Sequence, residues 1–355
     1  MPLLTTIIPT LNRSRMLVGT IQSVLAQTFA DWEIHVYDDA SEDETRRVVQ
    51  AIARSESRIK YFCHPQRIGM MPNFAFGIGR VESPYFNILS DDDLVLPKFY
   101  SVGVHALQAN AKAMAFIGLL ILAGSDGRIF DVPAVNWKEG LCYPPMSFVN
   151  LTGGHTWTSM IFRREALKTV GTLDTSVGSP GDQDFELRIA ARHPVIVDRS
   201  PCAIFRIHSG SGSARDPLPG LLAGIPRAIE NVSGAIALAE RERVIDSTAA
   251  GTMRRAMLAG FQGQVFRQAL VAIRHKHTAS VLRAAEFLAQ YPQTQRRARL
   301  VQLMGSSAIL SPLTYTSLSA ARRILRVSRW RKYRSYKSMT VCAFQRAVSA
   351  AACER

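Results

Sequence analysis

The sequence has few cysteines, and no two of them lie close together. The five are widely separated and form no CxxC pair: Cys63, Cys142, Cys202, Cys342 and Cys353. Structural zinc sites and disulfide frameworks usually need closely spaced or evenly numbered cysteines. We therefore expect neither kind of site, and the cysteine content is typical of a reducing compartment.

An export signal and a long hydrophobic run are also missing. Residues 1–3 lead straight into an apolar stretch with no basic segment before it, which predicts that there is no secretory signal. The longest apolar run lies within residues 113–123 and is too short to span a bilayer, so it predicts a buried strand. We expect a cytoplasmic protein.

Acidic residues are scarce in the last third of the chain. The formal net charge is +15, yet residues 221–355 hold 22 Lys and Arg against 6 Asp and Glu, while residues 1–220 hold 21 against 22. This asymmetry predicts a catalytic domain at 1–219 and a basic, α-helical region at 220–355. A basic tail also suits nucleic-acid binding, but no zinc-finger or RNA-recognition signature occurs.

Strand-like and helix-like patterns alternate in the first hundred residues. Apolar, β-branched runs at 3–8, 32–37, 59–62 and 85–89 predict strands, and helical spacing at 14–25, 48–52 and 72–78 predicts helices between them. This alternation predicts an α/β fold with a mostly parallel central sheet. Ligands bind such sheets at the carboxyl ends of the strands, where polar clusters follow three of these runs.

The pattern is less regular after Pro97. Strands are predicted at 114–122, 157–162, 195–197 and 203–207, with a hairpin turn at 124–127. Helices are predicted at 164–170 and 185–192, and helical signals dominate from residue 221 onward.

Three adjacent aspartates, Asp91, Asp92 and Asp93, follow the predicted strand at 85–89. Three neighbouring carboxylates repel one another unless a cation lies among them, and hard divalent cations such as Mg²⁺ and Mn²⁺ prefer oxygen ligands. The triplet therefore indicates a metal site. The alternative is a solvated acidic loop.

Several motifs in order resemble the family 2 glycosyltransferases, which have the GT-A fold. The resemblance covers residues 3–215. The matching stretches are TTIIPTLNR (5–13), Gln27-Thr28, WEIHVYDDASEDET (32–45), Gly69 with Asn73, LSDDDLVLP (89–97), FRREALKTVGTLD (162–174), GDQDFELRIAARH (181–193) and FRIHSGSGS (205–213).

The resemblance implies a role for each candidate residue. The donor-binding residues would be Pro9, Thr10, Asn12, Asp38, Asp39, Ser41, Asn73 and Asp91, with Asp38 contacting the base of a nucleotide sugar. Asp92, Asp93 and His208 would hold Mn²⁺ or Mg²⁺, and Asp182 would be the catalytic base.

Alternatives remain for four of these residues. Asp38 and Asp39 are also suited to a simple turn, His208 to an ordinary loop, and Asp184 could be the base in place of Asp182. The sequence departs from the family pattern at Ser90, where many members have Asp, and at Gly181, where many have Glu.

The implied activity is an inverting, metal-dependent transfer of a sugar from a nucleotide-diphosphate sugar to a hydroxyl of a glycan or lipid-linked acceptor, in cell-surface polysaccharide synthesis. A sugar nucleotidyltransferase is the main rival, but that chemistry usually shows a glycine-rich loop after the first strand. Here no glycine occurs before Gly19. A catalytically inactive scaffold is a third possibility, although nearly all of the expected site residues are present.

The tail contains a segment suited to a membrane surface. Residues 322–337 hold eight basic residues and no acidic one, and Trp330, Tyr333 and Tyr336 recur every third residue among them. A helix of this kind can lie in the lipid interface, so we expect peripheral attachment to the inner face of the plasma membrane and no binding to nucleic acid. The alternative is a helix that packs on the catalytic domain.

Overall fold

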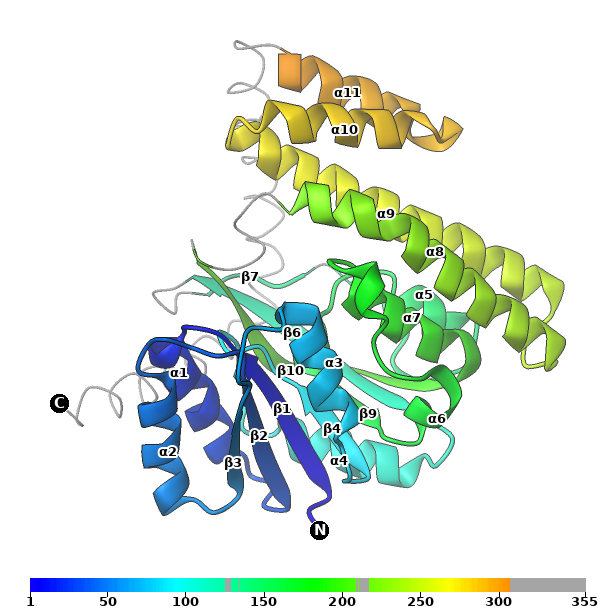
Figure 1. Ribbon diagram of the computed structural model, residues 1–355. Coiled ribbons are helices and arrows are strands. Elements are labelled where there is room, and N and C mark those ends of the chain that lie inside the picture. Colours follow the sequence, from blue (N-terminus) through cyan, green and yellow to red (C-terminus); the bar gives the residue numbers. More distant parts are fainter. Residues whose placement is uncertain (125–128, 134, 209, 211–216, 307–355) are drawn as a thin grey trace.

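The computed structural model describes residues 1–124, 129–133, 135–208, 210 and 217–306. The described residues form one ten-stranded sheet flanked by helices, with more helices stacked beyond one face (Figure 1). The strands are β1 (Leu4–Thr10), β2 (Trp32–Asp38), β3 (Ile59–Cys63), β4 (Tyr85–Ile88), β5 (Leu94–Val95), β6 (Ala115–Gly124), β7 (Ile129–Asp131), β8 (Gly140–Cys142), β9 (Met160–Arg163) and β10 (Val195–Ile207).

The helices alternate with these strands and then continue alone. They are α1 (Ser14–Leu25), α2 (Thr45–Ser55), α3 (Met70–Gly79), α4 (Phe99–Ala109), α5 (Met146–Asn150), α6 (Ala166–Val170), α7 (Gly181–Arg192), α8 (Leu218–Arg241), α9 (Ser247–Arg274), α10 (Thr278–Ala289) and α11 (Gln295–Ser306).

The first half of the sheet is parallel. Strands run in the order β3-β2-β1-β4-β9-β6-β10-β5, and β3, β2, β1 and β4 pair in parallel. Beyond β4 the sheet is mixed, because β9 runs antiparallel to both β4 and β6 while β6 and β10 are parallel. The predicted α/β fold is confirmed, and its parallel part is the part that positions the site.

Each face of the sheet packs against its own layer of helices. Helices α1, α2 and α4 bury residues such as Leu17, Val49 and Phe99 against one face. Helices α3 and α7 bury Phe74 and Phe185 against the other. Both faces are covered, which explains why β1 and β2 read as continuous buried runs in the sequence.

Two predicted elements differ in detail. The runs at 195–197 and 203–207 form the single strand β10, whose register with β6 shifts on both sides of Pro201. Proline cannot donate a ladder hydrogen bond, so the strand bulges there and continues. The predicted strand at 157–162 begins as a short 3₁₀ helix, η1 (Trp157–Ser159), and only Met160–Arg163 is extended. The predicted hairpin turn at 124–127 lies largely outside the described residues.

The C-terminal helices are continuous with the core of the sheet domain. Helix α8 begins at Leu218, beside the predicted boundary, and packs along α7. Its residues Leu221, Ile225 and Val232 share one buried cluster with Phe185 of α7. Figure 1 shows α9 antiparallel to α8, with the α10–α11 pair beyond them.

Among the described residues, one helix has the length and composition to cross a membrane. This helix is α8, and a third of its most apolar window is buried inside the protein. The buried side chains of α8 lie in the shared core, so packing accounts for that third of its apolar window. The predicted membrane-binding segment at 322–337 lies outside the described residues.

Candidate functional site

A cavity of about 740 Å³ lies at the carboxyl ends of β1, β2 and β4. It collects side chains from segments that are far apart in the sequence, including Pro9, Thr10, Asn12, Arg13, Asp39, Met71, Asn73, Phe74, Asp91, Asp92, Trp157, Asp182 and His208. The register explains this convergence, since Thr10 pairs with Asp38 and Ile7 pairs with Ile88, so that all three strands end at one edge. This cavity is the site predicted from the strand ends.

Arg13 holds two of the three aspartates together. Its Nη1 donates to Asp91 Oδ1 at 2.9 Å and to Asp92 Oδ2 at 2.7 Å, and its Nη2 donates to the Gly210 carbonyl at 2.8 Å. Thr10 Oγ1 donates to the other Asp91 oxygen at 2.8 Å. Burial opposes the charge of Arg13, but the two carboxylates raise the pKa of its guanidinium. The cation that the triplet requires is thus supplied here by an arginine.

Burial also acts on Asp91 itself. It raises the pKa of Asp91 to about 6, although Arg13 and Thr10 favour the ionised form. Asp91 is therefore a carboxylate that already accepts several hydrogen bonds at the cavity wall, in a position to orient a neutral polar group such as a ribose.

His208 reaches Asp92 from the end of β10. His208 Nε2 lies 3.0 Å from Asp92 Oδ2, and the Gly210 backbone N–H donates to His208 Nδ1 at 3.1 Å. A neutral imidazole that accepts at Nδ1 carries its proton on Nε2, so Nε2 donates to Asp92 in this arrangement.

Asp93 points away from the cavity. Its Oδ2 accepts from Thr158 Oγ1 at 2.7 Å, and its Oδ1 accepts from the Arg206 backbone N–H at 3.0 Å. The side chain is fully buried, and burial together with Asp92 raises its pKa. The geometry departs here from the sequence expectation of a metal ligand, because both oxygens tie the triplet to η1 and β10.

Asp38 and Asp39 also face different surroundings. Asp38 is fully buried and accepts from the Ser41 backbone N–H and from the Tyr61 hydroxyl, so its carboxylate shapes the turn. Asp39 lines the cavity and accepts from the backbone N–H groups of Ile68 and Gly69, at 2.7 and 3.0 Å. The predicted contact to a nucleotide base is thus open to Asp39 in this structure and not to Asp38.

Two predicted residues, Asn12 and Ser41, fix the loop after β1. The Asn12 backbone N–H donates to Ser41 Oγ at 2.9 Å, and Asn12 Oδ1 accepts from the Glu42 N–H at 2.7 Å. Asn12 has a φ of 53°, a left-handed conformation that asparagine tolerates better than most residues. Asn12 lines the cavity, and Ser41 supports it from outside.

Asn73 is held inside the cavity wall. Its Nδ2 donates to the Tyr37 carbonyl at 2.9 Å, and its Oδ1 lies 3.0 Å from His64 Nε2. These contacts join α3 to the end of β2.

Asp182 stands in the first turn of α7, on the cavity wall, and is partly exposed. Burial and then the charge of Glu186 raise the pKa of Asp182 to about 7. Asp184 is fully buried and accepts from Arg188 Nε at 2.9 Å, one helical turn away. Of the two carboxylates left open by the sequence, only Asp182 lines the cavity.

Gly181 brings α7 close to α3. A Cβ atom at this position would lie 2.5 Å from Met71 Cε. A glutamate here, as many family members have, would therefore require the Met71 side chain to move away from the cavity wall.

The residues present are compatible with a divalent cation. Asp92 Oδ2 and His208 Nε2 lie 3.0 Å apart at the cavity, and a carboxylate oxygen and an imidazole nitrogen are ligands that such cations accept. To hold a cation, His208 Nε2 would have to give up its proton to Nδ1, and the Gly210 N–H that donates to Nδ1 would have to turn away. Within the described ranges no three His, Cys, Asp or Glu side chains form a ready metal cluster.

Sequence reasoning did not single out Arg13 and Arg206. Arg13 bridges Asp91 and Asp92, while the Arg206 side chain donates to the Asp92 carbonyl. Both lie inside stretches that resemble the family, and this position in a motif is the sequence feature that could have identified them. Their pairing with the triplet is a tertiary contact that spacing along the chain does not predict.

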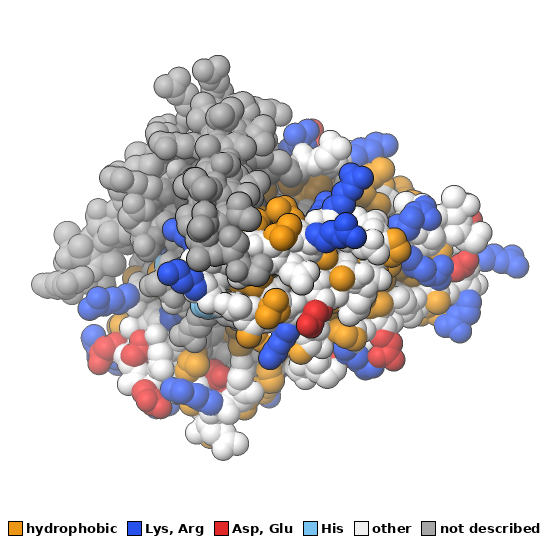
Figure 2. All heavy atoms as spheres, turned by 90° about the horizontal axis from the view of Figure 1, so that it is seen from above, with side chains coloured by type: hydrophobic (Ala, Val, Ile, Leu, Met, Phe, Trp, Pro, Cys, Tyr) orange, Lys and Arg blue, Asp and Glu red, His pale blue; other side chains and the backbone are white. Residues whose placement is uncertain are grey.

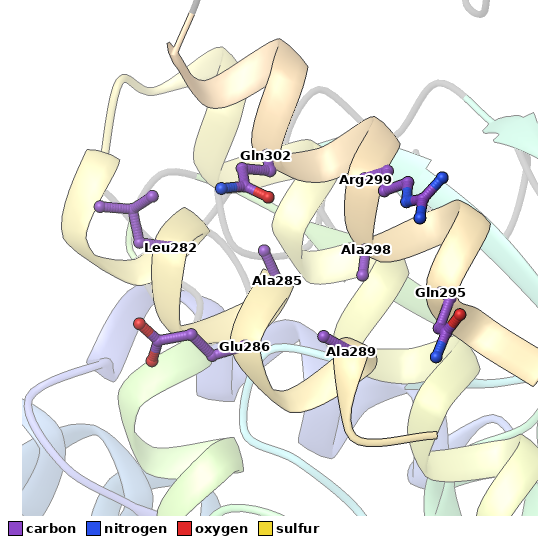
Figure 3. Close-up of a pocket in the computed structure, with 8 residues that line it drawn as sticks. All are labelled: Leu282, Ala285, Glu286, Ala289, Gln295, Ala298, Arg299 and Gln302. Carbon is purple, nitrogen blue, oxygen red and sulfur yellow. The ribbon is translucent and has the colours of Figure 1, made fainter. Parts of the chain in front are cut away.

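A second hollow of about 390 Å³ lies between α10 and α11 (Figure 3). Its lining consists of three alanines, one leucine and four polar residues: Ala285, Ala289, Ala298, Leu282, Glu286, Gln295, Arg299 and Gln302. It holds none of the polar clusters described above, so the cavity at the strand ends is the candidate active site.

Comparison with known proteins relates this chain to glycosyltransferases. Residues 5–171 match the family described as "Glycosyl transferase family 2". The chain is 39% identical over 97 residues to a GalNAc(5)-diNAcBac-PP-undecaprenol beta-1,3-glucosyltransferase of Campylobacter jejuni, which covers 27% of this chain and 31% of that protein. The chain thus spans about a third of the length of the first curated relatives that it matches.

Solved structures share the fold over most of the chain. S. aureus TarS 1-349 in complex with UDP-GlcNAc aligns with a TM-score of 0.59 at 15% identity, over 85% of this chain and 88% of that one. A mannosyltransferase from Pyrobaculum calidifontis in complex with GDP-Man and Mn²⁺ aligns with a TM-score of 0.50 at 17% identity, over 89% and 87%. Identities this low establish similarity of fold alone.

Proposed function

The chain contains a glycosyltransferase domain of family 2, and from this premise we propose that it moves a sugar from a nucleotide-diphosphate sugar to a hydroxyl group, with inversion at the anomeric carbon. One observation carries the proposal: a single cavity brings the Asp91–Asp92 pair and Asp182 together from two distant parts of the sequence. Transfer needs both, one to hold the donor and one to accept a proton.

The donor half of the cavity is proposed to be the edge formed by β1, β2 and β4. Asp39 would contact the base and Asp91 the ribose, since both carboxylates line the cavity and accept hydrogen bonds. Arg13 would lie near the diphosphate, because its guanidinium is already placed between Asp91 and Asp92.

Asp92 and His208 are the residues that we propose for a divalent cation, Mn²⁺ or Mg²⁺. When bound, the cation would supply electrostatic stabilisation to the leaving diphosphate. Asp93 would keep the loop in place through Thr158 and Arg206. The mannosyltransferase structure that contains Mn²⁺ supports this assignment by its fold.

Asp182 is proposed to take the proton of the acceptor hydroxyl. A general base works best when its pKa lies near the working pH, and such a group contributes about 10²–10⁴-fold to the rate. The pKa of Asp182, raised to about 7, meets this condition. Direct displacement with a single base inverts the configuration of the anomeric carbon.

The acceptor is proposed to be a glycan or lipid-linked glycan used in cell-surface polysaccharide synthesis, at the inner face of the plasma membrane. The name of the Campylobacter jejuni relative, which includes an undecaprenol-linked glycan, supports this class. The described α10–α11 pair adds a second support, because its exposed side chains include Arg283, Arg296, Arg297 and Arg299 against a single acid, Glu286. Figure 2, which views the molecule from that side, shows Lys and Arg side chains over this face.

The experiment that tests the proposal is a panel of nucleotide sugars. Purified protein is incubated with UDP-glucose, UDP-GlcNAc and GDP-mannose in the presence of Mn²⁺, with water as the acceptor of the sugar, and release of the nucleoside diphosphate is measured. We expect release with at least one donor, and no release from Asp182→Asn. Release of pyrophosphate from a nucleoside triphosphate and a sugar phosphate would instead identify the rival nucleotidyltransferase activity.

A further inference from the structure

We propose that the buried pair His155–Glu186, whose acid lies one helical turn after Asp182, sets the pH at which Asp182 can accept the acceptor's proton. The inference rests on the proposed role of Asp182 as the base. It assigns a function to two titratable residues that no step described above uses.

The pair is shielded from solvent. His155 Nε2 lies 2.8 Å from Glu186 Oε2, and the two side chains are 3% and 4% exposed. The ring of Trp137 stacks edge-on against His155, with the ring centroids 6.2 Å apart. Burying a carboxylate without a partner costs free energy of folding. His155, on the loop before η1, supplies that partner inside the protein, so the pair is not a chance surface contact.

Glu186 lies one helical turn after Asp182 on α7. Side chains at this spacing face the same side of a helix, so the Glu186 charge acts on Asp182 directly. Gly181 leaves the position before Asp182 without an acid, and a side chain there would meet Met71. Glu186 therefore gives the base the acidic neighbour that the sequence around Gly181 lacks.

The charge balance of the pair explains the direction of its effect. Burial opposes a charged His155, but the Glu186 carboxylate raises the pKa of the imidazole. Burial is the largest cause of the raised pKa of Asp182, Glu186 is the next, and His155 acts weakly in the opposite sense. Because the Glu186 carboxylate acts on Asp182 more strongly than His155 does, Asp182 stays protonated to a higher pH.

Other charged groups near Asp182 come from across the cavity. They are Arg13, Asp39, Asp91, Asp92 and His208, which line the same space. On the packed side, α3 contributes Met71, and α9 brings Gly260 beside Thr152 and the neutral Gln183 amide. The other charged pairs of α7, Asp184–Arg188 and Arg192–Glu242, involve residues further along the helix.

Glu186 also has a free oxygen. Its Oε1 is buried and has no hydrogen-bond partner among the described residues. The carboxylate therefore keeps an open acceptor site inside the protein, where the low dielectric strengthens its effect on neighbouring charges.

The test is the titration of Asp182 in full-length protein, followed by ¹³C NMR with labelled aspartate and assigned by the signal lost in Asp182→Asn. In Glu186→Gln the anion is gone and the amide oxygen still accepts from His155. We expect the pKa of Asp182 to fall by about one unit. Glu242→Gln, which removes a carboxylate paired with Arg192 at the other end of α7, is the matched control and should leave that pKa unchanged.

Several outcomes would overturn the proposal. One is an unchanged pKa of Asp182 in folded Glu186→Gln. If that variant does not fold, the double variant His155→Asn with Glu186→Gln is titrated in its place, and failure of both to fold would assign the pair to structure alone. The pH dependence of nucleotide release should show the same downward shift of its acid limb in Glu186→Gln. This rate is measured with a donor that the nucleotide-sugar panel identifies.

The two proposals fail in different ways. If Asp182→Asn keeps full transfer activity, the proposed base is wrong, whatever the titration gives. If Asp182→Asn is inactive but Glu186→Gln leaves both the pKa and the acid limb unchanged, only the role of the pair is wrong.

Discussion

At the scale of single residues, Asp92 is the side chain on which the proposed donor chemistry depends most. It accepts from Arg13 and lies beside His208, so it is both neutralised and placed for a cation. Asp92→Asn should reduce Mn²⁺-dependent nucleotide release by at least about 10²-fold, the scale seen when one electrostatic group is removed from an active site. Loss of Mn²⁺ binding, measured by calorimetry, should accompany the loss of activity.

The fold should tolerate this change. Arg13 keeps its contact with Asp91, and the triplet loses one repulsive charge, so Asp92→Asn should remain folded, as measured by urea unfolding. The exposed Asp31→Asn is the control for removal of a carboxylate elsewhere. Activity of Asp92→Asn that survives EDTA would reject the metal role.

Asp182 gives a prediction about pH. The base must be ionised to accept a proton, and the pKa of Asp182 is raised to about 7. The rate should therefore rise with pH through about 7 and level off above it, with kcat/KM as the measured quantity. Asp182→Asn should abolish transfer but retain donor affinity, because the base acts on the acceptor alone.

Asp184→Asn separates catalytic from structural loss. Asp184 is the buried partner of Arg188, so its substitution should lower the free energy of unfolding by about 3–5 kcal/mol, measured by thermal or urea unfolding. If the folded fraction of Asp184→Asn were inactive while Asp182→Asn retained transfer, the two roles would have to be exchanged.

Residue type alone could not predict which aspartates reach the cavity. Asp38 and Asp39 are adjacent, as are Asp92 and Asp93, and in each pair one carboxylate lines the cavity while the other is hydrogen-bonded inside the protein. Successive side chains alternate along an extended strand, which applies to Asp38 and Asp39 at the end of β2. Asp92 and Asp93 instead lie at a turn in which Asp91 and Asp92 both line the cavity, and one member of each pair still turns inward. Which one does so depends on Tyr61 and Thr158, which lie far away in the sequence.

At the scale of elements, the close approach of α8 to α7 supports the base. A Cβ atom on Gly224 would lie 2.0 Å from the Val177 carbonyl and 2.7 Å from Pro180 Cδ, just before α7 begins. Backbone atoms cannot move aside as a flexible side chain can. Gly224→Ala should therefore push α8 from α7, lower the free energy of unfolding by about 1–3 kcal/mol and reduce transfer.

Gly234 on the same helix is the matched control. Nothing lies within 4 Å of a Cβ atom there. Gly234→Ala should stabilise the helix by about 0.5–1 kcal/mol, because alanine loses less backbone entropy than glycine. A Gly224→Ala variant with the same melting temperature as Gly234→Ala would contradict the tight contact.

Strong local patterns predicted the elements well, and tertiary pairing decided the rest. The strands β1 to β4 have apolar runs and helical patterns between them, so their presence and parallel direction followed from the sequence, while their order in the sheet did not. β10 was predicted as two strands because Pro201 interrupts its pattern, and only pairing with β6 on both sides of that residue makes it one. The mixed half of the sheet likewise depends on β9, which has just four residues.

At the scale of the whole molecule, the helices after residue 217 belong to the same folded body as the sheet. One buried cluster runs from Ile7 of β1 through Phe185 of α7 to Phe261 of α9 and Val301 of α11. The change of charge near residue 219 marks a change in surface character, and the buried residues on both sides of it remain in contact. The boundary predicted at residue 219 stays a prediction that rests on composition. The described parts of the chain on its two sides share one buried core.

The charge asymmetry instead leads to a prediction about location. Each cation close to an anionic lipid surface contributes about 1 kcal/mol, and the segment 322–337 carries eight of them with three aromatics. The full chain should therefore sediment with anionic vesicles at low salt and be released at high salt, since screening shortens the reach of these charges. Neutral vesicles are the control and should leave the protein in solution.

A chain that ends near Ala320 separates the two basic surfaces. It keeps the exposed arginines of α10 and α11 and loses the segment 322–337. If the segment is the anchor, the shortened chain should bind anionic vesicles much more weakly than the full chain while releasing nucleotide at the same rate from a soluble donor. Equal binding by both chains would assign attachment to the α10–α11 face. Binding by neither chain would reject a membrane role for the basic region, and the net charge of +15 would then need another partner.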